Sequence, residues 1–431
     1  METNMMTQVP GKRNRDIISD LPGEVINLIL MRLPLRDAVR TSILSRKWRY
    51  NWAKLPKLTL DHTLWEDISI RRVRGELGVI LLQLLSFHQG PVTECRISSI
   101  PDPQHFPVID SLMYFLSRNG IEDLVLELPL GEKYKLPSSV FTCSQMRHLV
   151  LRYCDINPPP TFEGFSKLLR LQLSDVAISD KCLENLISRC PLLEHMELDI
   201  SHPLNYIEVN APNLRFLYFG SKIISICFTN TPLLADVSIV AVDVNHGSVE
   251  RGTCHFVEFF RSLPAVKNLC LGQFIIKKIL TAGLNEIPVK LPMPLLSLRQ
   301  LSVFDICLSK LDEIHCLLCL IKSSPYLKEI VIIMQAINND EGDEVPAFKL
   351  LEAEYDSDIK LNQLTKVKLI DIRGTKPEME LIKLLLGTSL MLEKMLIAPF
   401  YIEPESPITL VELLKQVNTF QRASPKAKVI F

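Results

Sequence analysis

The sequence is poor in glycine, in tryptophan and in uncompensated charge. Its 431 residues include 16 glycines and 3 tryptophans, and 48 Lys and Arg balance 49 Asp and Glu to a net charge of −1. So little glycine, together with 47% hydrophobic residues, excludes collagen-like, low-complexity and disordered chains. The near-neutral charge provides no global field that would favour nucleic acid or an acidic membrane, so we expect neither as a partner.

Long apolar runs and the usual catalytic signatures are also missing. The longest uncharged apolar stretch, residues 77–93, is interrupted by glycine, glutamine, histidine and proline. It falls short of the roughly 20 apolar residues that a membrane span needs. The sequence has no G-x-x-x-x-G-K-[ST], G-x-G-x-x-G, G-x-S-x-G or H-E-x-x-H motif. We therefore expect no catalytic residue, no metal site, no cofactor and no membrane span.

The cysteines indicate a reducing compartment. The chain has 11 of them, an odd number, and the opening METNMMTQVPGKRNRD has no apolar core of a signal peptide. We expect free thiols in the cytoplasm or the nucleus. The basic run Lys12, Arg13 and Arg15 is either a nuclear-targeting signal or a solvated tail. The C-x-x-C from Cys316 to Cys319 fits helix packing or zinc and redox chemistry, and its leucine neighbours favour packing.

Leucine, by contrast, is in excess, at 69 residues. An apolar frame Φ-x-x-Φ-x-Φ, in which Φ is an apolar residue, recurs at offsets that average about 27, within the 20 to 29 residues of leucine-rich repeats. Two earlier frames at Leu55 and Val92 extend the series. The frames begin at Ile121, Met146, Leu168, Leu193, Leu214, Leu234, Val266, Leu298, Leu327, Leu364 and Leu392.

Each frame predicts a short strand, because its last two Φ positions are spaced by two and face the same side. Segments with a helical period lie between the frames, as in SDKCLENLISRC, where Ser179 or Asp180 supplies the N-cap. A proline phrase precedes many frames and ends each helix. We therefore expect an α/β solenoid of irregular leucine-rich repeats, with parallel strands backed by helices. Only Cys154 meets the Asn or Cys position of regular repeats, so we expect variable curvature.

Residues 16–56 are expected to form a separate module of three helices. In SDLPGEVINLILMRLP, Asp20 can cap a first helix, Glu24 complements its dipole and Pro34 ends it. This helix is apolar nearly all round, and about 40 residues have too little mass to bury it, so another protein is its natural cover. RDAVRTSIL predicts a second helix, and Ser45 can cap a third in SRKWRYNW.

The run DIISDLPGEVINLILMRLPLRDAVRTSILSRKWRYNWAKLPKL resembles a plant F-box almost end to end. In that family the F-box docks on a Skp-type adaptor, which links it to cullin, and the repeats hold the protein to be ubiquitylated. The resemblance implies that the matching apolar positions form the adaptor surface or its immediate support, while some of them form the small core of the module. These positions are Leu21, Pro22, Ile26, Ile29, Leu33, Val39, Leu44 and Trp48.

The C-terminal segments LTKVKLIDIRGTKPEMELIKLLLGTSLMLEKMLI and FQRASPKAKVIF resemble the FBD domain at the end of many plant F-box and leucine-rich-repeat proteins. The expected organisation is a basic tail over residues 1–15, an F-box over 16–56, irregular repeats over 57–345 and an FBD domain over 346–431. We expect the FBD domain to continue the strands and helices and to cap the end of the solenoid.

Residues that alternate with the buried Φ positions are expected on the concave face of the solenoid. Exposed aromatic side chains beside arginines are typical of binding hot spots. The candidate substrate patch is Arg152, Arg170, His195, Phe216 and Tyr218, whose alternative interpretation is an ordinary mixed sheet surface. The acidic stretch from Asn338 to Glu344, followed by Glu352, Glu354, Asp356 and Asp358, is either a solvated loop or a contact for a basic partner.

These features favour a non-enzymatic substrate-recognition subunit of an SCF-type ubiquitin ligase, which binds a Skp-type adaptor, through it cullin, and an unknown protein substrate. One alternative is a small-molecule receptor of the F-box and leucine-rich-repeat type, which requires a deep pocket with convergent Lys or Arg. A second alternative is a protein-interaction scaffold outside any ligase.

Overall fold

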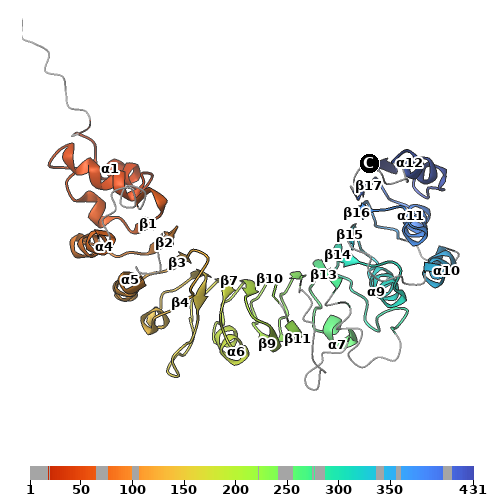
Figure 1. The fold of residues 1–431 in the computed structure, drawn as a ribbon, viewed down its shortest axis with the longest axis horizontal. Helices are drawn as coiled ribbons and strands as arrows, with labels where there is room; N and C mark the ends of the chain where they lie inside the picture. The colour runs from red at the N-terminus through yellow and green to blue at the C-terminus, as the bar shows by residue number, and fades with distance from the viewer. Residues whose placement is uncertain are drawn as a thin grey trace, which may run out of the picture. The chain divides into compact units, whose positions relative to one another are not determined.

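The computed structural model describes residues 18, 20–64, 76–99, 106–221, 223–240, 256–273, 276, 287–335, 344–355, 361–400 and 410–431. The chain forms two compact units, residues 1–130 and 131–431. Figure 1 labels their helices and strands. The first unit holds the N-terminal helical module and the first repeats, and the second holds the remaining repeats.

The N-terminal module begins with α1 (Gly23–Leu30) and α2 (Leu35–Arg40). Pro22 is the N-cap residue of α1, and Pro34 is the N-cap residue of α2. The expected cap at Asp20 was therefore wrong by two residues. The reason is that proline has its φ already fixed near the value that a helix start needs, and its missing N–H would find no partner there.

The third predicted helix of this module is replaced by turns. After the 3-10 helix η1 (Thr41–Ile43), residues 46–50 form turns, and the 3-10 helix η2 (Asn51–Lys54) follows. Tyr50 has a φ of 63°, which interrupts any continuous helix through this segment. Ser45 caps no helix, and its hydroxyl is buried without a hydrogen-bond partner.

The rest of the first unit includes three parallel strands and the helices α4 and α5. Strand β2 pairs in parallel with both β1 and β3. The elements are β1 (Lys57–Leu60), α4 (Glu76–Phe87), β2 (Glu94–Ser98), α5 (Phe106–Arg118) and β3 (Asp123–Glu127). The apolar frame positions on these strands, such as Leu60 and Ile97, are buried, so the two earliest frames belong to the repeat series as predicted.

The second unit is built on one parallel sheet whose strands follow one another in chain order. Within this unit, consecutive strands of the sheet pair with each other in parallel, which is the arrangement of a solenoid. The strands are β5 (His148–Arg152), β7 (Arg170–Val176), β8 (His195–Ile200), β10 (Phe216–Phe219), β12 (Asp236–Ile239), β13 (Asn268–Gly272), β14 (Gln300–Ile306), β15 (Glu329–Met334), β16 (Lys366–Ile372), β17 (Lys394–Pro399) and β18 (Lys428–Ile430).

The apolar frames form the core, as the sequence predicts. The two strand positions of every frame are buried, for example Leu171 and Leu173 in β7 and Met395 and Ile397 in β17. The first Φ of every frame is buried as well and lies in the turn that leads into the strand. The fold class, an irregular leucine-rich-repeat solenoid behind an N-terminal helical module, is confirmed.

The second layer of the repeats is partly helical and partly extended. The helices are α6 (Asp180–Ser188), α7 (Phe256–Arg261), α9 (Leu311–Lys322), α10 (Glu344–Tyr355), α11 (Lys376–Thr388) and α12 (Leu410–Thr419). Figure 1 shows α6, α9 and α11 on the same side of the sheet. As predicted, Ser179 caps α6, because its side chain accepts a hydrogen bond of 3.3 Å from the backbone N–H of Cys182.

Two successive repeats carry strands where we expected helices. Strands β9 (Leu204–Asn210) and β11 (Ile223–Asn230) pair with each other in a separate parallel sheet. A smaller pair joins β4 (Tyr134–Lys135), which precedes the 3-10 helix η4 (Ser138–Thr142), to β6 (Cys154–Asp155), which follows β5. The frames that follow Leu193 and Leu214 begin about 21 and 20 residues later, at the short end for such repeats. An extended segment rises more per residue than a helix, so it spans the back of a short repeat with fewer residues.

A recurring aspartate occupies the next-to-last position of three strands, β7, β14 and β16, in an unusual conformation. Asp175, Asp305 and Asp371 have φ values of 54°, 58° and 62°, and the strand register shifts around each of them. Asp is one of the few residues that enter this left-handed region readily. The repeats therefore use an aspartate bulge at the strand exit, where regular repeats use an Asn or Cys ladder.

The described part of the acidic stretch is helical. Residues 338–343, 356 and 358 lie outside the described residues, whereas Glu344, Glu352 and Glu354 lie in α10. The carboxylate of Glu354 pairs with Nζ of Lys322 in α9 at 2.7 Å, and both side chains are largely buried. The part of this stretch that the structure describes thus joins α9 and α10 through a largely buried ion pair, and the expectations for residues 338–343 lie outside the described residues.

Candidate functional site

The apolar residues of the N-terminal module divide into a core and a surface. Ile26 and Leu30 of α1 are completely buried, and Trp48 and Trp52 are nearly so. The indole Nε1 of Trp48 donates a hydrogen bond of 3.0 Å to the backbone carbonyl of Ile18. Ile26 and Trp48, two of the predicted adaptor-binding positions, therefore lie inside the module and can act only as support for its surface.

The other predicted adaptor-binding positions lie at or near the surface. Ile29 and Leu44 are exposed apolar side chains, and Pro22 is exposed at the start of α1. Leu21, Leu33 and Val39 are half-buried.

Between the start of α1 and the end of η1, four further aliphatic or methionine side chains are exposed that were not predicted as adaptor-binding. They are Val25, Leu28, Met31 and Ile43. Leu28 is 56% exposed and Ile43 is 87% exposed. The first three could have been predicted from the sequence. Ile26 and Leu30, four residues apart, define the buried side of the apolar helix, and Val25, Leu28 and Met31 lie on its other sides. For Ile43 the 3-10 segment decided the direction of the side chain.

The second candidate surface is the face of the parallel sheet that points away from the buried frame residues. It carries the residues that alternate with them along each strand. Register places Arg170, His195 and Phe216 opposite one another on β7, β8 and β10. Tyr218 lies two residues further along β10, opposite Glu197 of β8. The structure therefore brings four of the five predicted patch residues together on three adjacent strands.

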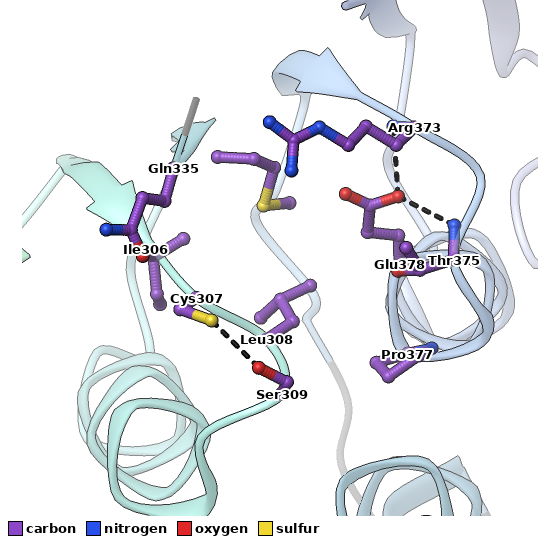
Figure 2. A pocket seen from close by; sticks show the side chains of 10 residues that line it. Ile306, Cys307, Leu308, Ser309, Gln335, Arg373, Thr375, Pro377 and Glu378 are labelled. Carbon is purple, nitrogen blue, oxygen red and sulfur yellow. Dashed lines mark hydrogen bonds between the residues drawn. The ribbon is translucent and has the colours of Figure 1, made fainter. Parts of the chain in front are cut away.

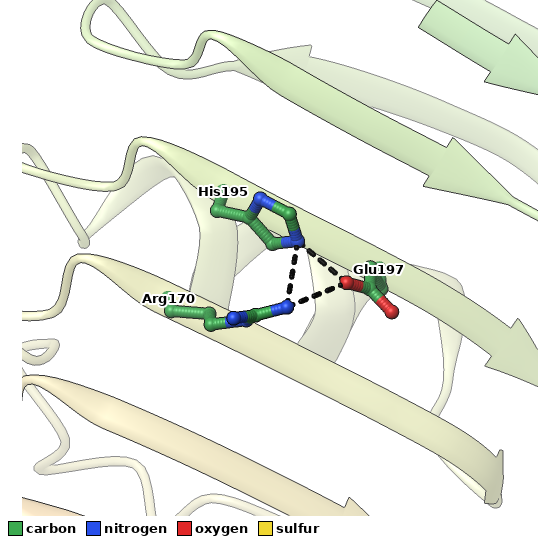
Figure 3. Close-up of polar contacts among 3 residues, drawn as sticks. All are labelled: Arg170, His195 and Glu197. Atoms are coloured by element: carbon green, nitrogen blue, oxygen red, sulfur yellow. Dashed lines mark hydrogen bonds and ion pairs between the residues drawn. The ribbon is translucent and has the colours of Figure 1, made fainter.

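Arg170, His195 and Glu197 form a compact polar cluster (Figure 3). Nε2 of His195 lies 2.5 Å from Oε1 of Glu197, and Nη2 of Arg170 lies 3.0 Å from the same oxygen. Nη2 of Arg170 is also 3.2 Å from Nε2 of His195. A guanidinium only donates, and an imidazole nitrogen so close to a carboxylate carries the proton, so both donors converge on Glu197.

This cluster controls the ionisation of Glu197. Partial burial by itself raises the pKa of Glu197, but the hydrogen bonds and the positive charges of His195 and Arg170 outweigh it, so the pKa lies below its ordinary value. Glu197 thus stays a carboxylate at neutral pH and holds the side chains of Arg170 and His195 flat against the sheet.

The aromatic residues of the patch are fixed by their neighbours. The ring of His195 stacks on the ring of Phe216 with centroids 4.1 Å apart and an interplanar angle of 2°. Partial burial raises the pKa of Tyr218, and the nearby carboxylates of Asp199 and Glu197 add to this effect. Tyr218 is 37% exposed and stays a neutral phenol, available as a hydrogen-bonding aromatic.

Arg152, the fifth predicted residue, lies apart from this group. Its Nε is 3.8 Å from Oδ2 of Asp175, and its guanidinium lies 5.2 Å from the ring centre of Tyr153. Burial and the charge of Asp175 raise the pKa of Asp199, while Arg152 lowers it. Arg152 therefore neutralises an acidic pair at the strand exits and is separated from Tyr218 by Asp199.

A shallow hollow of about 140 Å³ continues the patch across β10, β12, β13 and β14. Phe216 forms one wall, and the rest is lined by small polar side chains such as Ser238, Asn268 and Ser302. No Lys or Arg lines it. The hollow matches one or two side chains of a protein in size, and it is smaller than typical pockets for small molecules.

A second, much smaller hollow lies at the exits of β14, β15 and β16 (Figure 2). Its volume is about 20 Å³, enough for a single water molecule. Glu378 at the start of α11 fills one side, where its Oε2 accepts hydrogen bonds from the backbone N–H groups of Arg373 (3.0 Å) and Thr375 (2.9 Å). The carboxylate therefore accepts hydrogen bonds from backbone N–H groups that follow β16.

The same arrangement recurs at α9, two helices earlier in the chain. Oε2 of the buried Glu313 in α9 accepts a hydrogen bond of 2.8 Å from the backbone N–H of Cys307, two residues after the bulge at Asp305. Arg373 likewise follows the bulge at Asp371 by two residues. Both buried glutamates are therefore part of the repeat architecture and are not candidates for acid–base catalysis.

The C-x-x-C cysteines pack inside α9. Cys316 and Cys319 are both buried. Burial raises the pKa of Cys319 to about 11 and raises that of Cys316 well above its usual value. Their thiolates are disfavoured, which supports the packing interpretation over redox chemistry.

A metal site and a membrane-spanning helix are both absent from the described residues. They contain no group of three or more His, Cys, Asp or Glu placed to hold a metal ion. Among the same residues, no helix combines the length and the apolar character that crossing a membrane requires.

The fold and its surfaces define a class of protein: a leucine-rich-repeat solenoid preceded by a small helical module with an apolar surface. Residues 18–59 match the family model of the F-box domain. Residues 109–332 match a model described as "FBD-associated F-box protein At5g56370, LRR repeats".

Several proteins of Arabidopsis thaliana are similar over most of the chain. The F-box/FBD/LRR-repeat protein At1g13570 is 35% identical over 426 residues, which cover 96% of this chain and 98% of that protein. The FBD-associated F-box protein At5g22730 is 24% identical over 89% of this chain and 87% of its own length. The F-box/LRR-repeat protein At3g03360 is 25% identical over 74% of this chain and 71% of its own. The chain belongs to the plant F-box/FBD/LRR-repeat protein family.

Proposed function

We propose that this protein is the substrate-recognition subunit of an SCF-type (Skp–cullin–F-box) ubiquitin ligase. The F-box binds a Skp-type adaptor, which connects the chain to cullin, and the face of the repeat sheet binds the protein to be ubiquitylated. The chain contributes no catalytic group, because the ubiquitin-transfer chemistry resides in other subunits. The described cysteines are free thiols, which fits a cytoplasmic or nuclear protein.

The exposed apolar surface of the F-box carries this proposal. The core of the module is already complete with Ile26, Leu30 and the two buried tryptophans. Leu28, Ile43 and Leu44 nevertheless remain at least half exposed. Several exposed apolar side chains in one small module support a protein-binding surface, because covering them with a partner protein removes apolar area from water, which is favourable.

The experiment is co-expression of the full chain with a plant Skp-type adaptor, followed by measurement of the dissociation constant by surface plasmon resonance. We expect Leu28→Ala combined with Ile43→Ala to weaken binding about 30-fold or more, the effect of losing a buried anchor. Both side chains are exposed in the free chain, so the melting temperature should stay the same.

The matched control is Leu130→Ala combined with Val289→Ala. These two side chains are 83% and 70% exposed and lie outside the F-box. The control should bind the adaptor like the wild type. Adaptor binding that is unaffected by the Leu28 and Ile43 pair, or that is equally weakened by the control, contradicts the proposal and favours a scaffold outside the ligase.

The substrate surface is proposed to centre on Tyr218, Phe216 and the hollow beside them. Tyr218 offers an exposed ring with a hydrogen-bonding tip, and the hollow provides a socket for a partner side chain. Neither hollow described above has the convergent Lys or Arg that a receptor for an anionic small molecule requires. A target protein is therefore the better-supported ligand.

A further inference from the structure

The last three strands of the second unit carry a row of lysines. Register places Lys366 of β16 opposite Lys394 of β17, and Lys394 opposite Lys428 of β18. All three side chains are exposed. Neighbouring strands lie about 4.8 Å apart, so the backbone positions of the three lysines lie within about one Debye length of each other at about 0.1 M salt.

This lysine row lacks internal compensation. Among the described residues, no carboxylate forms an ion pair with the ammonium group of any of the three lysines. The nearest acidic residue in the same register row, Glu329 of β15, is engaged by Nζ of Lys368 at 2.6 Å. Like charges directly opposite each other destabilise a sheet, so the row costs stability in the free protein.

The corresponding row is compensated at other strands of the chain. Lys57 of β1 pairs with Glu94 of β2 at 3.0 Å. Arg170 of β7 pairs with Glu197 of β8 at 3.0 Å. The unpaired lysine row is therefore a local feature of β16–β18 and not a general property of these repeats.

Protection of a sheet edge explains only one member of the row. Lysine on an edge strand discourages pairing with other chains, and β18 is the last strand of the sheet. Lys366 and Lys394, however, lie on strands that are paired on both sides. Two of the three lysines thus need another explanation.

An apolar strip adjoins the row on the same face. Leu396 and Ile430 lie two residues beyond Lys394 and Lys428 and are opposite each other in register. Ile430 is 39% exposed, and Leu396 is half-buried. The surface therefore offers three positive charges next to a small apolar strip.

We propose that this face of β16–β18 is a docking surface for an acidic peptide segment of a partner protein, with Asp or Glu carboxylates on the lysine row and an apolar residue on the strip. An extended peptide advances about 3.3 Å per residue, so three or four residues span the row. The surface is distinct from the F-box and from the patch around Tyr218, and the proposal does not depend on adaptor binding.

The test uses the full chain and a fluorescein-labelled peptide, Gly-Glu-Glu-Leu-Glu-Glu-Leu-Gly, with binding followed by fluorescence anisotropy at two salt concentrations. We expect saturable binding that weakens as salt rises. The same peptide with Gln in place of Glu should bind at least about tenfold more weakly, since it loses every charge pair.

The decisive variant is Lys366→Glu, Lys394→Glu and Lys428→Glu, which should lower the affinity for the acidic peptide at least about tenfold. The matched control is Lys181→Glu, Lys349→Glu and Lys415→Glu, which makes the same change of net charge at exposed positions of α6, α10 and α12. The control should stay within about twofold of the wild type. The neutral variant with Gln at the three row positions should also bind weakly and should melt no lower than the wild type, because the repulsion is relieved.

Four results overturn the proposal. They are no saturable binding of the acidic peptide, an equal loss of affinity in the control variant, equally tight binding of a single-stranded DNA oligonucleotide of matched charge, and a dimer in light scattering that the row variant converts to a monomer. The third result would assign the row to polyanions in general, and the fourth would assign it to a second copy of the chain.

Discussion

His195 and Phe216 lie opposite each other on neighbouring strands, and their rings are parallel with centroids 4.1 Å apart. This stack ties the polar cluster around Glu197 to the aromatic end of the proposed substrate surface. The pair is worth roughly 0.5 to 1.5 kcal/mol beyond the area it buries.

The stack can be measured by a double-mutant cycle. We expect each of the single variants His195→Ala and Phe216→Ala to have a lower free energy of unfolding than the wild type. The sum of these two losses should exceed the loss in the double variant by about 0.5 to 1.5 kcal/mol. Urea denaturation of the four proteins provides the numbers. Strict additivity would show that the contact between the two rings contributes nothing to stability.

The carboxylate of Glu197 should make stability depend on acid. Its pKa is lower in the folded chain than its usual value of 4.5, so its contribution is present above pH 4.5 and is lost as the pH falls through the folded-state pKa. Glu197→Gln removes this titration. The difference in free energy of unfolding between wild type and variant should therefore shrink as the pH is lowered from neutral through 4.5. Parallel stability curves would contradict the assignment.

Glu378 should show the opposite sign. Burial raises its pKa above 4.5, although the N–H groups of Thr375 and Arg373 work against this. Its contribution is fully present below pH 4.5 and decreases as the pH rises through the folded-state pKa. Glu378→Gln keeps an acceptor oxygen but does not titrate, so the stability of this variant relative to wild type should increase between pH 4.5 and neutral pH. A relative stability that is independent of pH, or that falls, argues against a raised pKa.

The aspartate bulges should tolerate glycine and reject β-branched residues. Asp305 is exposed and has a φ of 58°. Glycine enters this conformation at no steric cost, so we expect Asp305→Gly to change the free energy of unfolding by less than about 1 kcal/mol. Asp305→Val should cost about 1 to 3 kcal/mol more than glycine does. Equal effects of the two substitutions would show that the strand exit relaxes to another conformation.

The buried thiols should resist alkylation in the native chain. Burial raises the pKa of Cys190 and of Cys319 to about 11, so at pH 8 only about one molecule in a thousand carries either thiolate. Iodoacetamide followed by peptide mass spectrometry should label the partly exposed Cys182 well before these two. Early labelling of Cys319 in the folded protein would revive a redox role for the C-x-x-C.

The repeats could be predicted from the sequence because their signal is local. Each frame places its apolar residues two apart on a strand, and the buried Leu171 and Leu173 are one instance among many. The backing layer could not be predicted in full, since the same frames accept a helix such as α6 or strands such as β9 and β11. Repeat length distinguishes the two, because the repeats backed by β9 and β11 are the short ones.

In the F-box, the apolar pattern of the first helix predicted that a partner covers it. It did not predict which side chains face that partner. Ile26 and Trp48 matched the family pattern as well as Ile29 and Leu44 did, yet the first two are buried and the last two are exposed. The direction of each side chain depends on how the turns after α2 fold back, and Tyr50 with its φ of 63° sets that path.

The sequence alone determined the class of this protein, because apolar frames, proline phrases and the F-box and FBD motifs act through neighbours in the chain. The excess of leucine and the near absence of net charge already indicated a repeat protein that recognises other proteins. Only the tertiary structure decided which residues share a surface. The cluster of Arg170, His195 and Glu197 and the lysine row from Lys366 to Lys428 join residues about 25 to 60 positions apart, and it is strand register that brings such residues together.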